Sequence, residues 1–425
     1  MERLLHYVWK HRLFPPGSLV TTDGLPVSVI DTGIQNTNAG PDFFNAQVKI
    51  GEIMWAGCVE IHDKSSDWIR HHHDKDKAYD AVVLHLTGKC DIPVYRTTGD
   101  LIPQAILTVP ETVQRNIDWL IHREEALPCL SGIKNIDPIH LSAWTNALLC
   151  ERLERKTNDI LRLLEQYNDD WNEVFYIILT RTFGFGVNND AFERLAKSIP
   201  FRYIQKHRGS SLQIEALLFG QAGMLQEEDD GLDTYFQALQ KEYRFLRHKF
   251  ELTPLDDYLF KSLRMRPGSF PHIRLAQLAA LWMRYDSLFS VIRDEENLEL
   301  IKKLFKVHPS AFWQTHNHFR NNSPKAEKYI GEGSLSVLLI NVAVPMLFAF
   351  GQKNKLPEHC ERAICFLESI PAESNSIVST FCRAGIKAHH AGDSQALIQL
   401  KREYCEKKQC LHCRIGFRLL KRERQ

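Results

Sequence analysis

Two runs of alternating apolar residues, separated only by residues 51–52, place the strongest constraint on the fold of this chain. The first run is FFNAQVKI (43–50) and the second is IMWAGCVEIH (53–62). An alternation with period two is typical of strands that bury one face, and a two-residue Gly-Glu connection indicates a tight hairpin. The hairpin would bring Asp42, which precedes the first strand, beside Glu60, which lies near the end of the second strand.

Asp42 and Glu60 would form a pair of carboxylates with an imidazole beside them. Glu60 and His62 are two positions apart on one strand, so their side chains point to the same face. Carboxylate oxygens are preferred ligands of Mg²⁺ and Mn²⁺, and a bound divalent ion can generate an attacking water. The sequence therefore predicts a hydrolytic site with Asp42 and Glu60 as metal ligands and His62 orienting the water.

The apolar pattern predicts an α+β fold with two parts. Residues 2–13 have a helical pattern, and the strand-like runs after it lie at 26–31, 43–50, 53–62, 81–87 and 92–96. A short helix is expected after Ser66 or Asp67. Beyond this region the period becomes helical, in segments 111–126, 138–166, 170–183, 188–198, 212–226, 231–250, 271–290, 296–306, 334–350, 358–368, 375–391 and 393–405. We predict an α/β domain over 1–110 and a helical domain over 111–425.

The composition is that of a soluble globular protein, and the formal net charge of +1 excludes a uniformly basic nucleic-acid-binding coat while leaving local patches open. The N-terminal segment MERLLHYVWKHRLF has no long apolar run, so we expect no signal peptide. The most apolar stretch, 335–350, contains Asn341 and Pro345 and is predicted to be a buried helix, with no membrane span. Ten cysteines without a secretion signal indicate reduced thiols and a cytoplasmic protein.

A second metal site could be built from the histidine-rich segment after the hairpin. Five histidines fall within two dozen residues: His62, His71, His72, His73 and His85. One arrangement is a zinc or manganese site that uses His62, His73 and His85 with Glu60. The alternative is a solvated histidine-rich loop beside a core histidine that is bonded to backbone.

Three cysteines near the C-terminus have the spacing C-x₄-C-x₂-C, at Cys405, Cys410 and Cys413. This spacing is typical of iron–sulfur ligation and needs a fourth ligand. The fourth ligand could be Cys129, Cys360, Cys365 or Cys382, and His412 would complete a zinc site instead. Buried reduced cysteines without a metal are the other interpretation.

Two basic segments are candidates for contact with phosphates. The last 25 residues contain nine Lys/Arg against three Glu, in a Cys-rich basic tail. Arg264, Arg266 and Arg274 cluster around two prolines in LRMRPGSFPHIR, and we expect them to bind the substrate backbone.

The order helix–strand–strand–strand–helix–strand, with Asp42 after a proline and Glu60 eighteen residues later, resembles the core of the PD-(D/E)xK nuclease superfamily. The resemblance implies a restriction-endonuclease-like α/β core with a mixed sheet. It also implies that the aspartate and glutamate hold Mg²⁺ and that Glu2 is an additional acidic ligand. His62 stands where that superfamily has lysine, and Lys64 has the same strand parity.

The segments NAGPDFFNAQVKI, WAGCVEIHDKSSDW, HHHDKDKAYDAVVLHL, INVAVPMLFAFG and YCEKKQCLHCRIG resemble the bacterial domain-of-unknown-function 2851 family across essentially the full chain. That family implies a cytoplasmic bacterial protein and supplies no reaction. From the residues we expect a metal-dependent nuclease or phosphodiesterase acting on DNA or RNA. The alternatives are a catalytically degenerate nucleic-acid-binding protein and a helical scaffold that binds other proteins. The oligomeric state does not follow from the sequence.

Overall fold

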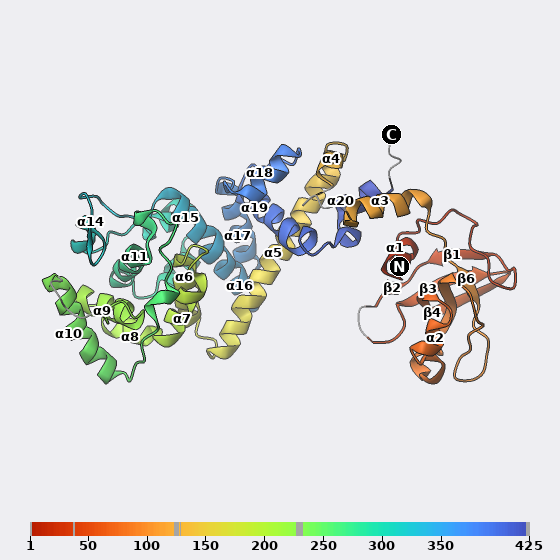
Figure 1. Cartoon of the computed structure of the whole chain (residues 1–425), viewed down its shortest axis with the longest axis horizontal. Coiled ribbons are helices and arrows are strands. Elements are labelled where there is room, and N and C mark those ends of the chain that lie inside the picture. Colours follow the sequence, from red (N-terminus) through yellow and green to blue (C-terminus); the bar gives the residue numbers. More distant parts are fainter. Residues whose placement is uncertain (1, 37–38, 123–126, 128, 227–232, 422–425) are drawn as a thin grey trace. The chain divides into compact units, whose positions relative to one another are not determined.

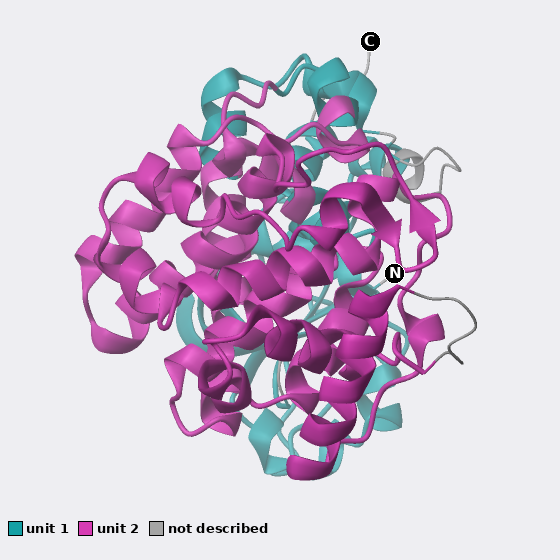
Figure 2. Cartoon of the chain, turned by 90° about the vertical axis from the view of Figure 1, so that its left-hand side faces the viewer, with its two compact units in different colours: residues 1–144, 380–386, 400–425 teal, residues 145–379, 387–399 magenta. Residues whose placement is uncertain are grey.

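The computed structural model describes residues 2–36, 39–122, 127, 129–226 and 233–421. The chain forms two compact units (Figure 2). Unit 1 comprises Met1–Trp144, Thr380–Ile386 and Leu400–Gln425, and unit 2 comprises Thr145–Ser379 and Lys387–Gln399. The α+β class is confirmed, with a mixed sheet near the N-terminus and a helical remainder (Figure 1). The predicted domain boundary at residue 110 falls inside unit 1.

The sheet of unit 1 has the strand order β1-β3-β4-β5-β6, with β2 paired to β3. β1, β3 and β4 are antiparallel neighbours, whereas β4, β5 and β6 run parallel, so the sheet is mixed. The strands are β1 (Val27–Asp31), β2 (Ile34–Gln35), β3 (Phe43–Ile50), β4 (Ile53–Lys64), β5 (Val82–Lys89) and β6 (Gln104–Ile106). The connection from β4 to β5 contains α2 (Asp67–Arg70), η1 (His73–Lys75) and η2 (Lys77–Tyr79).

The N-terminal helix α1 (Glu2–Lys10) packs on β4 and β5. It buries Leu4, Leu5, Val8 and Trp9, which recur with helical spacing. The predicted helix continued to residue 13, but the helix ends three residues earlier because Arg12 adopts a left-handed conformation with φ of 48°.

The strands predicted at 26–31, 43–50, 53–62 and 81–87 are confirmed as β1, β3, β4 and β5. The strand predicted at 92–96 is wrong, since only Tyr95 in this segment makes an isolated bridge, with Leu101. Pro93 has no N–H for a ladder, and the Ile92 N–H donates to the Ser65 hydroxyl instead. The last strand of the sheet is the later and shorter β6.

A β-bulge at Asn45 sets which residues face each other at the end of the hairpin. Ala46 pairs with Gly57, but Phe43 pairs with Val59, so β3 has one extra residue between these pairs. Asn45, the residue at the bulge, adopts a left-handed backbone conformation with a φ of 56°. Without the bulge, the Ala46–Gly57 register would continue and place Asp42 opposite Ile61. With the bulge, Asp42 lies opposite Glu60.

We predict that Asn45→Val destabilises unit 1 by about 1–2 kcal/mol relative to Asn45→Gly, because a β-branched residue pays the full cost of the left-handed conformation. Asn45 is exposed, so neither substitution removes core packing. Chemical denaturation of the two variants provides the comparison. Equal free energies of unfolding would show that the bulge does not depend on this backbone conformation.

The remainder of unit 1 comes from helices that are distant in sequence. α20 (Arg414–Leu420) packs on α3 (Glu111–His122), and η7 (Cys410–His412) lies directly before α20. α4 (Leu130–Ile133) and the π-helix η6 (Leu400–Cys405) complete this region, and α5 (Pro138–Gln166) begins in it. The last four residues of the helix predicted at 111–126 lie outside the described residues.

In the described part of unit 2 the regular structure is helical apart from the small hairpin of β7 (His316–His318) and β8 (Asn321–Asn322). Its core is rich in aromatic side chains, including Phe175, Phe183, Phe192, Phe219 and Trp282. Its first helices are α6 (Trp171–Phe183), α7 (Asn189–Ser198), α8 (Phe201–Lys206), α9 (Ser211–Gln221) and α10 (Thr234–Lys249). They are followed by α11 (Pro271–Arg284), α12 (Leu288–Asp294), α13 (Leu298–Leu304), α14 (Phe312–Thr315) and α15 (Glu332–Leu338). The last are η5 (Leu339–Ala343), α16 (Val344–Asn354), α17 (Pro357–Ser369) and α19 (Ala391–Gln399), whereas α18 (Ser376–Arg383) begins in unit 2 and ends in unit 1.

The segment Glu332–Asn354 is the one described helical stretch that is long and apolar enough to cross a membrane. Most of its apolar window is buried inside unit 2, as in the core helix of a soluble protein. The predicted buried helix at 335–350 is therefore confirmed, and the cytoplasmic location stays a prediction.

Candidate metal centre

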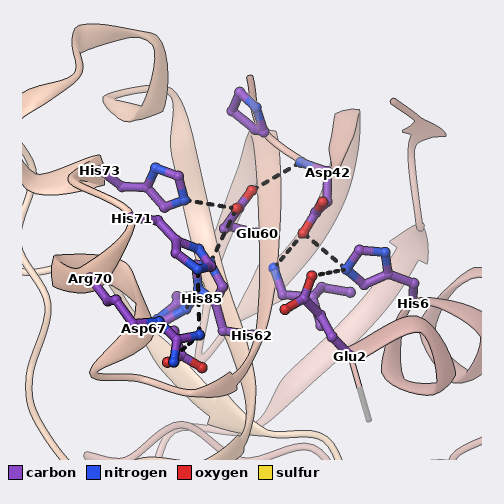
Figure 3. A network of polar contacts seen from close by, with 12 residues as sticks. Glu2, His6, Asp42, Glu60, His62, Asp67, Arg70, His71, His73 and His85 are labelled. Atoms are coloured by element: carbon purple, nitrogen blue, oxygen red, sulfur yellow. Dashed lines mark hydrogen bonds and ion pairs between the residues drawn. The ribbon is translucent and has the colours of Figure 1, made fainter. Parts of the chain in front are cut away.

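Asp42 and Glu60 lie side by side where β3 begins and β4 approaches its end (Figure 3). The backbone N–H of Asp42 donates to Glu60 Oε2 at 2.9 Å, and the N–H of Ile61 donates to Asp42 Oδ2 at 2.9 Å. Each carboxylate is thus held by the backbone next to the other and still has a second oxygen. The predicted pairing of the two carboxylates occurs.

Helix α1 adds two polar groups to the Asp42 side of the pair. His6 Nε2 lies 3.1 Å from Asp42 Oδ2 and 4.0 Å from Glu2 Oε1, one helical turn away. Burial by itself lowers the pKa of His6, but the hydrogen bond to Asp42 and the charges of Asp42 and Glu2 raise it overall. Glu2, predicted as an extra acidic ligand, therefore reaches the site through His6. Sequence reasoning missed His6, although its i, i+4 spacing from Glu2 was a usable signal.

Three imidazoles converge on the other side of Glu60 (Figure 3). Glu60 Oε1 lies 3.5 Å from His62 Nε2 and 3.3 Å from His73 Nε2. His71 Nδ1 lies 3.2 Å from His62 Nε2. One ring nitrogen from each of His62, His71 and His73 lies within 4.8 Å of the other two. Glu60 therefore contacts two clusters of side chains: Asp42 on one side and the imidazoles of His62 and His73 on the other.

The crossover between the parallel strands β4 and β5 carries His71 and His73 to this place. Trp68 of α2 is fully buried, and its ring lies edge-on to His73 with ring centroids 5.4 Å apart. His73 also stacks on Tyr79, with centroids 3.7 Å apart. His72 between them adopts a left-handed φ of 62° and is exposed, so its neighbours reach the site and it does not.

The spacing of the converging atoms suits a transition metal. Bonds of about 2.0–2.1 Å from a tetrahedral zinc ion to its ligands separate neighbouring ligand atoms by about 3.3 Å. Three separations have this size: 3.2 Å between His71 and His62, 3.3 Å between His73 and Glu60, and 3.5 Å between His62 and Glu60. The three imidazole nitrogens are a donor set suited to Zn²⁺ or Mn²⁺, and the Glu60 carboxylate contacts two of these rings, His62 and His73.

His62 is in the neutral form that metal ligation requires, as is His85 behind it. Burial and the neighbouring imidazoles lower the pKa of His62 to about 2, and burial lowers that of His85 to about 3. Burial raises the pKa of Glu60, and the hydrogen bond from His73 partly offsets this. A compact cluster of ionisable groups with perturbed pKa values is typical of functional sites.

His85 and Gln104 support His62 from behind. His62 Nδ1 lies 2.9 Å from His85 Nε2, and His85 Nδ1 lies 3.5 Å from the side-chain amide of Gln104. If His62 Nε2 binds a metal, Nδ1 must carry the proton and donate it to His85. Such an outer partner fixes the tautomer and the ring orientation of a ligating histidine. His85, predicted as a direct ligand in the zinc arrangement, thus lies behind His62.

The other predicted residues are distributed over both units. Lys64 is exposed at the end of β4, and Cys405, Cys410 and Cys413 lie elsewhere in unit 1. Arg264, Arg266 and Arg274 belong to unit 2. Arg274 is buried there, with its guanidinium 4.1 Å from the centre of the Phe185 ring and bonded to Gln277 and Ser334, whereas Arg264 and Arg266 are exposed. Their role in substrate binding stays a prediction.

We predict that His73→Asn weakens the binding of Zn²⁺ and Mn²⁺ by at least about 10–100-fold, the usual cost of losing only an outer-shell group. His72→Asn is the matched control, because it is the adjacent residue, it carries the same change and asparagine tolerates its left-handed conformation. Isothermal titration calorimetry of the metal-free protein measures both affinities. An equal loss of metal affinity in the two variants, or unchanged affinity in His73→Asn, would contradict metal binding at this site.

Comparison with known proteins gives one match. A family model described as "Protein of unknown function (DUF2851)" matches residues 2–376. No curated protein and no solved structure matches the chain.

Proposed function

The chain belongs to the DUF2851 family, whose description names no reaction, and from the geometry of the site we propose that it is a metal-dependent phosphodiester hydrolase acting on nucleic acid. The observation that carries the proposal is a continuous polar cluster beside a strongly cationic cleft: Asp42 and Glu60 are joined through backbone hydrogen bonds, and Glu60 contacts the imidazoles of His62 and His73. Metal ligands supply hydrolytic chemistry, and the cleft supplies affinity for a polyanion.

The cleft in unit 1 has a volume of about 1560 Å³ and shares Glu2 and His6 with the metal centre. Six lysines and arginines line it, and Glu2 is the one acidic residue among its lining residues: the basic residues are Arg3, Lys10, Lys407, Lys408, Arg414 and Arg418. A groove of this charge attracts a phosphate backbone and raises its local concentration. The basic tail predicted from the sequence thus contributes to a concave surface next to the metal centre.

The order of elements also supports nuclease chemistry. α1 is followed by the antiparallel strands β1, β3 and β4, and then by a helical crossover to the parallel strand β5. Asp42 and Glu60 occupy the positions that the PD-(D/E)xK resemblance assigns to metal ligands. We extend the proposal to a restriction-endonuclease-like core on this basis.

The side chains have separate tasks in this proposal. Asp42 and Glu60 hold the ion through the oxygens that their backbone amides leave available, and His6 with Glu2 orients Asp42. His62, His71 and His73 supply ring nitrogens, so the donor set favours Mn²⁺ or Zn²⁺ over Mg²⁺, which prefers oxygen. A divalent ion bound there would lower the pKa of a coordinated water and stabilise charge on the phosphate.

We predict that Asp42→Asn and Glu60→Gln each lower Mn²⁺-dependent cleavage of DNA or RNA by about 10²–10³-fold, since metal stabilisation of the transition state is worth several kcal/mol. Glu52→Gln is the control: it lies at the turn of the same hairpin, and its side chain is 95% exposed. The measurement is cleavage of labelled single- and double-stranded substrates with Mg²⁺, Mn²⁺ and Zn²⁺ in turn. Cleavage that is unchanged in Asp42→Asn, or absent from the wild type with every ion, would refute hydrolysis.

We predict that Arg3→Ala combined with Lys10→Ala weakens nucleic-acid binding and reduces the slope of log affinity against log salt by about 2, one for each lost phosphate contact. Both side chains are exposed on α1 and line the cleft. Lys206→Ala combined with Lys325→Ala, two exposed lysines of unit 2, should leave the slope unchanged. Fluorescence anisotropy over a range of salt concentrations measures the slopes, and equal effects of the two pairs would place binding elsewhere.

A second candidate function is nucleic-acid binding without cleavage. It is favoured by His62, which stands where the resemblance expects a cationic lysine and whose pKa of about 2 leaves it uncharged at neutral pH. The two functions differ in one result. Binding that depends on the cleft but is unaffected by Asp42→Asn, without cleavage by the wild type, would select the binding protein.

A further inference from the structure

Four cysteines from two distant parts of the sequence come together in unit 1. Cys405 ends η6, Cys410 begins η7, Cys413 precedes α20, and Cys129 precedes α4. η6, which ends at Cys405, packs on η7, which begins at Cys410. Burial raises the pKa of the Cys405 thiol first, and the charges of Cys129, Cys413 and Cys410 raise it further, so all three act on it electrostatically. The pKa of the Cys129 thiol is raised by burial and by the charges of Cys413 and Cys410.

Packing of the backbone fixes these segments against one another. A Cβ on Gly132 of α4 would lie 2.6 Å from the Leu419 side chain of α20, so the two helices are in close contact. Asn116 of α3 donates to the carbonyl oxygens of Leu419 and Leu420 at 3.2 and 3.1 Å. Gly416 lies directly against the carbonyl of Cys410, with no room for a side chain. These contacts hold α3, α4, α20 and the Cys410 segment against one another, and the four cysteines lie at the ends of η6, η7, α20 and α4.

A buried donor is directed at this group of sulfurs. Trp144 is 4% exposed, and among the described residues its Nε1–H has no hydrogen-bond partner at normal distance. It faces the Cys413 sulfur, which also accepts from the backbone amides of Ile415 and Gly416. The Trp144 ring contacts residues adjacent to two of the cysteines, Tyr404 at 5.2 Å between centroids and Arg414 at 5.0 Å. Several N–H donors around one sulfur are typical of a metal-bound thiolate.

We propose that Cys129, Cys405, Cys410 and Cys413 ligate an iron–sulfur cluster. Each thiol loses its proton on ligation, and the cluster irons take the place of those protons. The C-x₄-C-x₂-C spacing supplies three ligands of a known cluster pattern, and Cys129 supplies the fourth. His412, the alternative fourth ligand, lies in the wall of the cleft near Lys10 and Arg3.

The separation of the sulfurs favours a cluster over a single zinc ion. Zinc–sulfur bonds of about 2.3 Å bring tetrahedral sulfurs to about 3.8 Å from one another. Among the described residues, the group of three potential ligands that lies within 4.8 Å is the histidine group, and no three of these cysteine sulfurs approach that closely. A cluster spreads its ligands around several metal atoms and needs a wider arrangement.

The cluster would tie the C-terminal segment to the body of unit 1. Residues 407–409 and 411–415 line the cationic cleft. Burial raises the pKa of the Tyr7 hydroxyl on α1, and the charge of Cys413 raises it further, so this thiol acts on α1 electrostatically. The cluster would thus hold the wall of the cleft that faces α1. This role is independent of hydrolysis at Asp42 and Glu60.

The test is anaerobic purification of the full chain, followed by iron, sulfide and zinc analysis and visible absorption spectroscopy. We expect about two or four irons with equal sulfide per chain, and visible thiolate-to-iron absorption. Cys129→Ser should lose the iron and the absorption, as should Cys410→Ser. Cys382→Ser is the matched control, because this exposed cysteine belongs to unit 1 but not to the group.

Two results would overturn the proposal. One is stoichiometric zinc, or no metal, in the anaerobically purified and reconstituted wild type. The other is a full complement of iron in Cys129→Ser. The wild-type analysis decides the matter even if a variant fails to fold, and neither result depends on whether the protein cleaves nucleic acid.

Discussion

The reciprocal attachment of two carboxylates to backbone amides is the interaction on which the candidate site depends. Each of Asp42 and Glu60 accepts a 2.9 Å hydrogen bond from the backbone beside the other carboxylate. Holding two negative charges next to each other costs free energy. Burial of Glu60 adds to this cost, and it raises the pKa of the Glu60 carboxyl. A structure retains such an arrangement most readily where a cation or a proton offsets the repulsion, and the adjacent imidazoles provide further ligands for a cation.

The hairpin and its acidic pair follow directly from the sequence. The alternation in 43–50 and 53–62 determines the strands, and the period of two puts Glu60 and His62 on one face. The bulge at Asn45 could not be predicted, because the apolar pattern of residues 43–50 fits a regular strand equally well. It nevertheless decides that Glu60, and not Ile61, lies opposite Asp42.

The imidazole half of the site was only partly predictable. His62, His73 and Glu60 could be proposed as ligands because the segment is rich in histidine. The third imidazole of the group is His71 and not His85. This depends on how the connection between β4 and β5 folds over the parallel strands, and local sequence patterns do not encode that path. The same holds for Cys129: its proximity to Cys405 arises from packing between α4 and α20, almost 300 positions apart in the chain. Long helices such as α5 and α6, by contrast, are determined by apolar periodicity and were predicted almost to the residue.

The cationic cleft takes its walls mainly from the first dozen residues and from residues 407–418. The cleft therefore depends on the packing of two segments that are far apart in the sequence. Loss of this packing would abolish the concave surface without removing any of its charges, and an anion bound in the cleft would in turn stabilise the folded state of unit 1.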